Sequence, residues 1–482
     1  MQLRRTKIVA TLGPATSSID ALRDIIKAGA DVVRLNFSHG TAEDHQQRAT
    51  NVLKAAEIEG RHVALLADLQ GPKIRVAQFT NNKVQLKAGQ EFILDPNMNR
   101  EAGNEQAVGL DFPELGKDLN NGDILLLDDG RIVLEVMRIE ANKVYTQVQI
   151  GGPLSNNKGI NLQGGGLSAA ALTDKDRRDL LTAANIGVDY IAISFVRNAA
   201  DMHEARSLLD QANSSASLVA KIERAEAIEP TTLDGIIEAS EAVMVARGDL
   251  AVEIGDAALV GVQKDIIKRA RQLNRVVITA TQMMESMIES PMPTRAEVSD
   301  VANAVLDGTD AVMLSAETAV GDFPSQTVAA MARVCLGAES HPSILRSSHR
   351  LDVPIEATDE SIAMGAMYIA NHLQGVKAIV SMTLTGATPL LMSRLSSGIP
   401  IFAFTPQPAT QRRVCLYRGV ITHAFDSDYI DNAEINQIAI NQLKATGEVV
   451  DGDLVIITKG DYTKVHGGTN TLKVVRVGNN IR

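Results

Sequence analysis

The chain has 482 residues, which at roughly 150 residues per domain predicts about three domains and excludes a peptide or a single small module. Hydrophobic residues make up 45% and charged residues 22%, the usual mixture of a globular protein with large cores. The formal charge of -11, 3% aromatic residues and the absence of Trp argue against a nucleic-acid or anionic-membrane binder. An anionic ligand would therefore need a local cluster of Lys and Arg, or a metal.

The chain has two cysteines, Cys335 and Cys415, too few for a disulfide framework or a four-thiolate zinc site. Cys335 lies in an apolar helical pattern, so we expect it in the core rather than as a nucleophile. No window reaches the roughly 18 apolar residues of a membrane span. The opening segment breaks at Gly13-Pro14 and predicts a first strand rather than a signal peptide. We expect a soluble, cytoplasmic protein.

Short β-branched runs alternate with amphipathic helical segments along much of the chain. Continuous apolar runs of this kind are typical of buried parallel strands joined by right-handed crossovers. Eight strand–helix units predict an α/β fold, a (β/α)₈ TIM barrel, with a doubly wound open sheet as the alternative. The eight runs cover residues 7–12, 31–37, 62–68, 190–195, 217–223, 242–247, 275–281 and 310–315.

The spacing of these runs is interrupted once, between Asp68 and Tyr190. The interruption contains strand patterns joined by NN, DDG and GG turn signals, which predicts an inserted small β-barrel lid domain. The run Gly164-Gly165-Gly166 is interpreted as its hinge. A linker over 340–356 precedes a smaller C-terminal α/β domain. The predicted domains are the barrel (1–71 and 164–340), the lid (72–163) and the C-terminal α/β domain (341–482).

Polar residues follow all eight runs, at the strand ends where a barrel of this class has its active site. Lys221 and Glu223 are two residues apart on one strand and therefore face the same side, and Asp249 ends the next strand. Two carboxylates, with the remaining ligands from water and substrate, are a usual way to hold Mg²⁺. The alternative is a structural ion network on the barrel rim.

Further residues predict a site for an anion. Gly248 lets the backbone approach a ligand closely, and a helix starting there would offer free N–H groups. A positive, hydrogen-bonding wall would suit a phosphate ligand, and its members are Arg34, Asn36, Ser38, His39, Arg75 and Lys175. The chain has no G-x-S-x-G elbow, no G-x-x-x-x-G-K-[ST] loop and no dinucleotide fingerprint.

The motif series closely resembles that of the pyruvate kinase family over essentially the whole chain. The matching segments, in order, are TLGPAT, RLNFSHG, DLQGPKIR, KIERAEA, ARGDLAVE, ATQMMESM, PTRAEVSDVANAV and DAVMLSAETAVG. The resemblance implies transfer of a phosphoryl group from phosphoenolpyruvate to ADP, giving pyruvate and ATP in the last step of glycolysis. It also implies a catalytic barrel, a lid domain, a C-terminal regulatory domain and a homotetramer.

The resemblance further assigns roles to individual residues. Glu223 and Asp249 match the Mg²⁺ (or Mn²⁺) ligands, and Lys221 and Arg34 match the residues on the transferring phosphoryl group. Thr281 matches a residue near the enolate carbon. Gly248, Asp249 and Thr281 would hold the substrate carboxylate. The residues that match the nucleotide-binding positions are Asn36, His39, Arg75 and Lys175.

The chain departs from the family pattern D-T-K-G-P-E, which reads Asp68-Leu69-Gln70-Gly71-Pro72-Lys73 here. Family members that need K⁺ usually carry Glu where this chain has Lys73. A lysine there can supply the positive charge itself, so we expect turnover without K⁺. The monovalent-cation position of the family corresponds to Asn36, Ser38, Asp68 and Leu69.

A second departure lies in the C-terminal domain, where the phosphate-loop pattern T-x-S-G-R-[ST] lacks its arginine. Ala387 replaces it, and we expect a sugar monophosphate rather than a bisphosphate as activator. The proposed effector contacts are Thr383, Thr385, Gly386 and Thr388. Two other functions stay open at this point: a metal-dependent aldolase or lyase acting on pyruvate enolate, and a non-catalytic metabolite sensor.

Overall fold

The computed structural model describes residues 3–345, 354–426, 434–461 and 467–479, and a closed barrel of eight parallel strands lies at its centre. The strand order around the barrel is β1-β16-β15-β14-β13-β12-β3-β2, which confirms the predicted barrel and excludes the open sheet. Each predicted run supplies one strand. The barrel strands are β1 (Lys7–Thr11), β2 (Val32–Asn36), β3 (Ala64–Asp68), β12 (Tyr190–Ile193), β13 (Ser217–Ile222), β14 (Ala242–Ala246), β15 (Val276–Ala280) and β16 (Ala311–Leu314).

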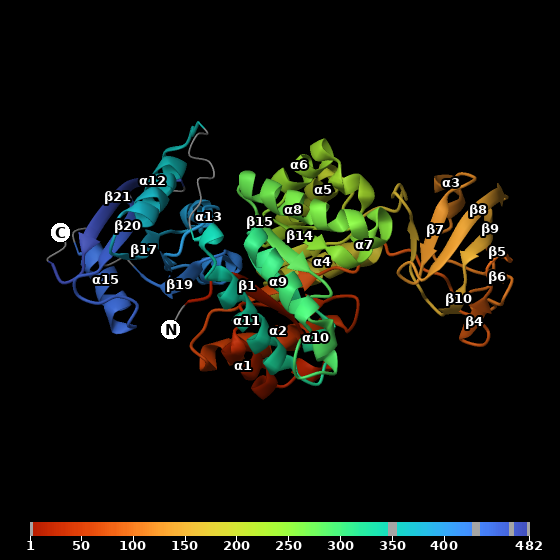
Figure 1. Ribbon diagram of the computed structural model, residues 1–482, viewed down its shortest axis with the longest axis horizontal. Coiled ribbons are helices and arrows are strands. Elements are labelled where there is room, and N and C mark those ends of the chain that lie inside the picture. The colour runs from red at the N-terminus through yellow and green to blue at the C-terminus, as the bar shows by residue number, and fades with distance from the viewer. Residues whose placement is uncertain (1–2, 346–353, 427–433, 462–466, 480–482) are drawn as a thin grey trace.

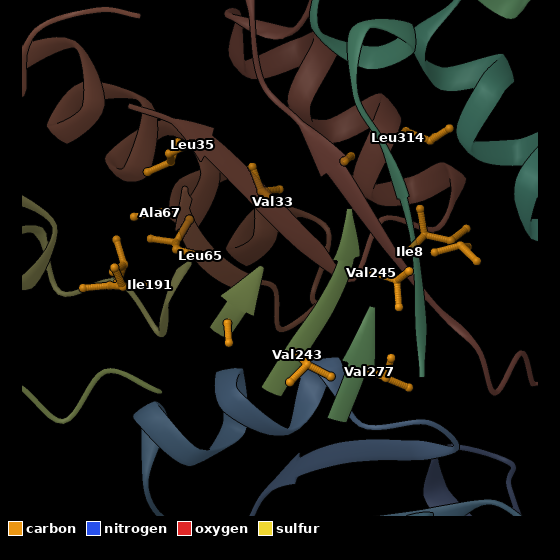
Figure 2. Close-up of a cluster of buried hydrophobic side chains, with 14 of the residues drawn as sticks. Ile8, Val33, Leu35, Leu65, Ala67, Ile191, Val243, Val245, Val277 and Leu314 are labelled. Carbon is orange, nitrogen blue, oxygen red and sulfur yellow. The ribbon is translucent and has the colours of Figure 1, made fainter. Parts of the chain in front are cut away.

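Side chains on the two faces of each barrel strand belong to two different hydrophobic cores. Ile8, Val33 and Leu65 belong to an outer aliphatic cluster, whose strand residues Figure 2 shows. Helix residues such as Leu22 and Ile25 complete the cluster. Val9 and Val32, the strand neighbours of Ile8 and Val33, belong to a different cluster, which fills the barrel interior. Because successive strand residues point to opposite faces, runs that are apolar at every position satisfy both cores at once.

Helices surround the barrel, most of them between consecutive strands (Figure 1). Ser18, Thr41, Thr173 and Thr294 cap four of them, and each side-chain oxygen accepts a hydrogen bond from a first-turn N–H. The helices of this region are α1 (Ile19–Ala28), α2 (Ala42–Ile58), α4 (Asp174–Ile186), α5 (Ala199–Gln211), α6 (Pro230–Glu238), α7 (Arg247–Ile254), α8 (Asp256–Gln272), α9 (Arg295–Asp307), α10 (Ala316–Ala319) and α11 (Pro324–Glu339).

The insertion between β3 and β12 forms two antiparallel-rich sheets at one end of the molecule (Figure 1). The larger sheet has the order β11 (Ile160–Leu162), β7 (Ile124–Leu127), β8 (Ile132–Glu140), β9 (Lys143–Ile150), β5 (Glu91–Leu94) and β6 (Ala107–Val108). The smaller one pairs β10 (Gly152–Ser155) with β4 (Lys83–Leu86), and α3 (Leu115–Asp118) is the single helix described between them. This inserted unit has its own apolar core around Phe92, Leu125 and Leu134.

The chain crosses from the inserted unit to the barrel over two adjacent residues. Gln163 donates its N–H to Ile124 in the inserted unit, whereas Gly164 donates to Glu253 in the barrel. Gly164, Gly165 and Gly166 all have positive φ, and a Cβ on Gly165 would lie 2.4 Å from the Glu226 carboxylate. Glycine is therefore required at this connection.

The C-terminal unit is a five-stranded sheet with helices, on the side of the barrel opposite the inserted unit (Figure 1). Its sheet order is β19 (Val420–Ala424), β18 (Ile401–Thr405), β17 (Val376–Met382), β20 (Leu454–Gly460) and β21 (Thr469–Arg476), and its helices are α12 (Thr358–His372), α13 (Ala387–Ser393), α14 (Pro408–Arg413) and α15 (Ile435–Ala445). The barrel-interior cluster continues into this unit through Met392, Leu395 and Tyr417. Tyr190, at the start of β12, donates to the carbonyl of Arg413 at 2.6 Å.

Of the predicted linker over 340–356, residues 346–353 lie outside the described residues. Among the described residues, no helix has both the length and the apolar composition needed to cross a membrane.

Candidate active site

A buried ion network lies at the C-terminal ends of the barrel strands. Asp68 is the last residue of β3, and its carboxylate lies 2.6 Å from Nε of Arg34 on β2 and 3.3 Å from Nζ of Lys221 on β13. Arg34 also donates to the hydroxyl of Thr11, the last residue of β1, at 3.1 Å. The side chain of Asp68 is 1% exposed, and the two cations are 13% exposed. The barrel thus presents Arg34 and Lys221 on either side of one carboxylate.

The charge states of this network follow from its contacts. Burial opposes ionisation of Asp68, but Arg34 and Lys221 outweigh it and hold the pKa of Asp68 below its usual value. Burial also opposes the charge of Lys221, but Asp68 and Glu223 outweigh it and raise the pKa of Lys221. Lys221 therefore remains a cation in a nearly water-free place, where its field is weakly screened.

Glu223 and Asp249 form the predicted pair of carboxylates. Oε1 of Glu223 lies 3.0 Å from Nζ of Lys221, and Oε2 accepts the backbone N–H of Phe195 at 2.7 Å. Burial raises the pKa of Glu223, Lys221 opposes that rise, and Asp249 adds to it. The two carboxylates are thus close enough to repel each other, and a divalent cation between them would relieve that repulsion. Among the described residues no group of three or more His, Cys, Asp or Glu could hold a metal. Mg²⁺ in substrate sites is usually bound by one or two carboxylates, so this pair is a candidate donor set.

A helix start adjoins the carboxylate pair. Helix α7 begins at Arg247, directly after β14, and so places Gly248 and Asp249 in its first turn. The N–H of Gly248 donates to the hydroxyl of Thr281 at 2.9 Å. Thr281 has φ of 68°, and non-glycine residues with such angles are held there by their surroundings. Arg247 stabilises this conformation of Thr281, because its guanidinium donates to the Thr281 carbonyl at 2.6 Å. The same guanidinium lies 2.7 Å from Asp300.

The structure brings together only some of the residues that were predicted to bind the nucleotide phosphates. Asn36 accepts the N–H of Ser38 at 3.1 Å, and the N–H of His39 donates to the Asn36 carbonyl at 3.3 Å. Lys175 on α4 joins this loop, because its ammonium lies 2.8 Å from the carbonyl of Phe37. Both Ser38 and His39 are exposed.

Arg75 lies apart from the other members of the wall. Its guanidinium donates to the carbonyl of Asn157 at 2.9 Å, and its N–H donates to Asp111 at 2.7 Å, both in the inserted unit. Within the described residues it forms no hydrogen bond with Asn36, His39 or Lys175. It could join them only through a shared ligand or a movement of the inserted unit.

Several oxygens expected at the monovalent-cation position already have partners, although Oδ1 of Asp68 has only its ion pair with Lys221 and forms no hydrogen bond within the described residues. Asp68 is paired with Arg34 and Lys221, the carbonyl of Leu69 accepts the hydroxyl of Ser194 at 2.7 Å, and Asn36 accepts from Ser38. Lys73 lies elsewhere: its ammonium is 2.7 Å from Asp249 and 3.7 Å from Asp129. The ammonium is therefore on a metal-ligand candidate and not on Asp68.

The loop over 383–388 in the C-terminal unit is closed by hydrogen bonds between its own residues. The hydroxyl of Thr383 accepts the N–H of Gly386 at 2.9 Å, and that of Thr385 accepts the N–H of Ala387 at 3.4 Å. Thr388 is buried and its hydroxyl lies 2.7 Å from that of Thr469 on β21. An effector on this loop would have to replace some of these contacts.

Several residues of the site were not predicted. Ser194 accepts a hydrogen bond from Lys221 at 2.8 Å, and Phe195 positions Glu223 with φ of 55°. Both follow β12 in the polar tail SFVR, which was the available signal. The roles of Arg247 and of the Lys73–Asp249 contact had no local signal, because their partners are distant in the sequence.

A closed parallel barrel whose strand ends gather cations and carboxylates around a helix start is the architecture of a (β/α)₈ enzyme acting on an anion. Comparison with known proteins identifies the particular family. The model described as pyruvate kinase, barrel domain, matches residues 3–328, and the one described as pyruvate kinase, alpha/beta domain, matches residues 360–475.

Individual proteins match over nearly their whole length. Pyruvate kinase II of Salmonella typhimurium is 59% identical over 477 residues, covering 99% of each chain. Pyruvate kinase of Haemophilus influenzae is 58% identical over 462 residues, covering 95% of this chain and 96% of that protein. The crystal structure of a pyruvate kinase from Cryptosporidium parvum superposes with a TM-score of 0.90 at 33% identity, covering 98% of this chain and 96% of that one. The chain belongs to the pyruvate kinase family, and it is a phosphotransferase.

Proposed function

We propose that this member of the family transfers the phosphoryl group of phosphoenolpyruvate to ADP, giving pyruvate and ATP, at the strand-end site around Lys221. The observation that carries the assignment is the position of Lys221. Its ammonium lies 3.3 Å from Asp68, 3.0 Å from Glu223 and 2.8 Å from Ser194, and is held as a cation at the end of the barrel.

Phosphoryl transfer depends on positioning and charge neutralisation more than on covalent attack. Lys221 and Arg34 would bind the oxygens of the phosphoryl group, and Lys221 would also stabilise the enolate oxygen left behind. Both side chains are held in place by Asp68, so little reorganisation is needed when charge develops. No nucleophilic side chain is required.

The substrate carboxylate would lie at the start of α7, near the backbone N–H groups of Gly248 and Asp249, and the N–H of Gly248 would have to exchange its bond to Thr281 for one to the substrate. Thr281 is bonded to the Gly248 N–H and lies beside that position, so its hydroxyl can take part in delivering a proton to the enolate carbon. Asn36, His39, Lys175 and Arg75 would bind the nucleotide phosphates. Arg75 would do so from the inserted unit, which would act as a lid that excludes water.

The family generally uses a divalent metal, and we assign Mg²⁺ or Mn²⁺ to Glu223 and Asp249. The burial of Glu223, the repulsion between the two carboxylates and their hard oxygen donors fit such an ion. A bound divalent ion would neutralise charge on the phosphoryl oxygens. We further propose cytoplasmic location, a homotetramer, turnover without K⁺, and activation by a sugar monophosphate at Thr383, Thr385, Gly386 and Thr388.

The test is a coupled pyruvate-formation assay with purified protein. Pyruvate should form from phosphoenolpyruvate only when both ADP and Mg²⁺ are present. Formation of pyruvate together with inorganic phosphate in the absence of ADP would mean that the phosphoryl group goes to water rather than to ADP, and metabolite binding without turnover would support a sensor. A panel of sugar phosphates in the same assay tests the activator.

A further inference from the structure

Lys73 connects the inserted unit to the candidate metal ligand Asp249. Its ammonium lies 2.7 Å from Oδ1 of Asp249 on α7 and 3.7 Å from Oδ1 of Asp129, in the turn between β7 and β8. The side chain of Lys73 is 20% exposed and that of Asp249 is 22% exposed, so the contact is sheltered from solvent. The ammonium therefore occupies Oδ1 of Asp249, one of the two oxygens of that carboxylate, and a divalent cation bound to the same carboxylate would lie at close range to it.

The path of the Lys73 side chain is shaped by its neighbour Gly159. A Cβ on Gly159 would lie 2.7 Å from Cε of Lys73, so any other residue there would push the lysine aside. The backbone around both residues is fixed, because Ile160 donates to the Ile74 carbonyl at 2.8 Å and Val76 donates to the Lys158 carbonyl at 2.9 Å. Lys73 is thus part of the inserted unit and reaches the barrel only with its side chain.

We propose that Lys73 is a positioning residue that occupies Asp249 before the divalent ion does, and that the ion must displace its ammonium. Two cations cannot share the same carboxylate oxygen at close range without strong repulsion. Asp129 is 68% exposed and already near the ammonium, so it can receive the displaced charge. The contact between the inserted unit and Asp249 would then break when the ion binds.

This inference rests on the proposed role of Asp249 as a metal ligand, and the two are tested with Mn²⁺ alone, without turnover. Free Mn²⁺ is titrated by electron paramagnetic resonance into the full-length protein and its variants. Asp249→Asn should weaken binding at least tenfold. Lys73→Met should tighten binding about fivefold, because the competing cation is gone.

Lys158→Met is the matched control. Lys158 lies in the same unit and pairs at 2.7 Å with Asp128, the sequence neighbour of Asp129, and among the described residues no ion pair joins it to Asp249. Its loss should change Mn²⁺ affinity by less than about twofold. Gly159→Ala, which keeps the lysine but obstructs its path, should tighten binding in the same direction as Lys73→Met.

Release of the Lys73 ammonium from Asp249 is measured by a second method, which leaves the charge of Lys73 in place. The wild-type protein is treated with limiting acetic anhydride with and without Mn²⁺, and acetylation of Lys73 and Lys158 is compared by peptide mass spectrometry. Mn²⁺ should raise acetylation of Lys73 severalfold and leave Lys158 unchanged. Unchanged Mn²⁺ affinity in Lys73→Met, or unchanged acetylation of Lys73, would overturn the inference while leaving the metal assignment intact. Unchanged affinity in Asp249→Asn would overturn both.

Discussion

The guanidinium of Arg394, in the C-terminal unit, donates to both carboxylate oxygens of Asp310, which immediately precedes barrel strand β16. Both side chains are 1% exposed. Asp310 also accepts the N–H groups of Val277 at 2.9 Å and Arg418 at 3.2 Å. One carboxylate thus joins two barrel strands to a separate folding unit.

The first prediction follows from this pair. Arg394→Met should destabilise the protein by about 3 kcal/mol or more, because it leaves Asp310 buried without its cation. The measurement is the first transition in guanidinium-induced unfolding. Arg177→Met, which removes an exposed pair with Glu204, should shift that transition by less than about 1 kcal/mol. Equal shifts in the two variants would contradict the assignment.

A second prediction concerns catalysis. Lys221→Met should lower turnover by about a hundredfold or more, because a neutral side chain cannot stabilise the developing oxyanion. Coupled pyruvate formation gives the rate, and circular dichroism checks that the fold is retained. Lys264→Met removes an exposed lysine paired with Asp307 and should leave turnover unchanged. Near-normal turnover in Lys221→Met would rule out its proposed role.

The third prediction concerns pH and Glu253 on α7. Burial raises the pKa of Glu253 to about 7, with the nearby Glu226 adding to the rise, although the N–H of Ala225 bonds the carboxylate at 2.8 Å. The native state therefore keeps a proton that the unfolded chain releases near pH 4.5. Since the native state binds more protons between these values, the stabilisation from this group is complete below about pH 4.5 and is lost as pH rises through about 7.

Glu253→Gln should remove this dependence. Relative to the variant, the wild-type protein should lose up to about 3 kcal/mol of stability between pH 4.5 and 8, as measured by chemical unfolding at several pH values. Glu105→Gln, at an exposed position of the inserted unit, serves as the control and should keep the wild-type profile. Parallel profiles for wild type and Glu253→Gln would show that the pKa of Glu253 is the same in the folded and unfolded states, which contradicts the prediction.

The fourth prediction concerns the K⁺ requirement of turnover. Pyruvate formation in Na⁺ or tetramethylammonium buffer should be almost as fast as in K⁺, and Lys73→Glu should create a K⁺ requirement because it changes the local charge by two units. A hundredfold drop for the wild type in K⁺-free buffer would mean that Lys73 does not replace the ion. The ammonium of Lys73 lies beside Asp249, so the K⁺-free assay also tests whether a positive charge at that position can replace K⁺.

The sequence was sufficient for the architecture because the barrel repeats one simple pattern eight times. The strand runs are largely apolar on both faces, and polar residues in their C-terminal halves mark the active-site end, as Arg34, Asp68 and Lys221 illustrate. The pairing of Lys221 with Glu223 followed from strand alternation alone.

Other contacts could not be predicted because they depend on how separately folded units meet. Lys73 reaches Asp249 across 176 positions of sequence, and Arg394 reaches Asp310 across 84. No periodicity or turn signal carries such information. The positive φ of Thr281 was equally hidden, since it is imposed by Arg247 from a neighbouring strand end.

The shared core between the barrel interior and the C-terminal unit limits how this enzyme can be engineered. Val9, Leu66 and Met244 of the barrel lie in one apolar cluster with Met392 and Tyr417. Using the catalytic barrel as a free-standing module would open this cluster to water at the end away from the active site. A minimal enzyme, or a fusion that exchanges the C-terminal unit, would need another apolar segment of matching shape to cover this cluster.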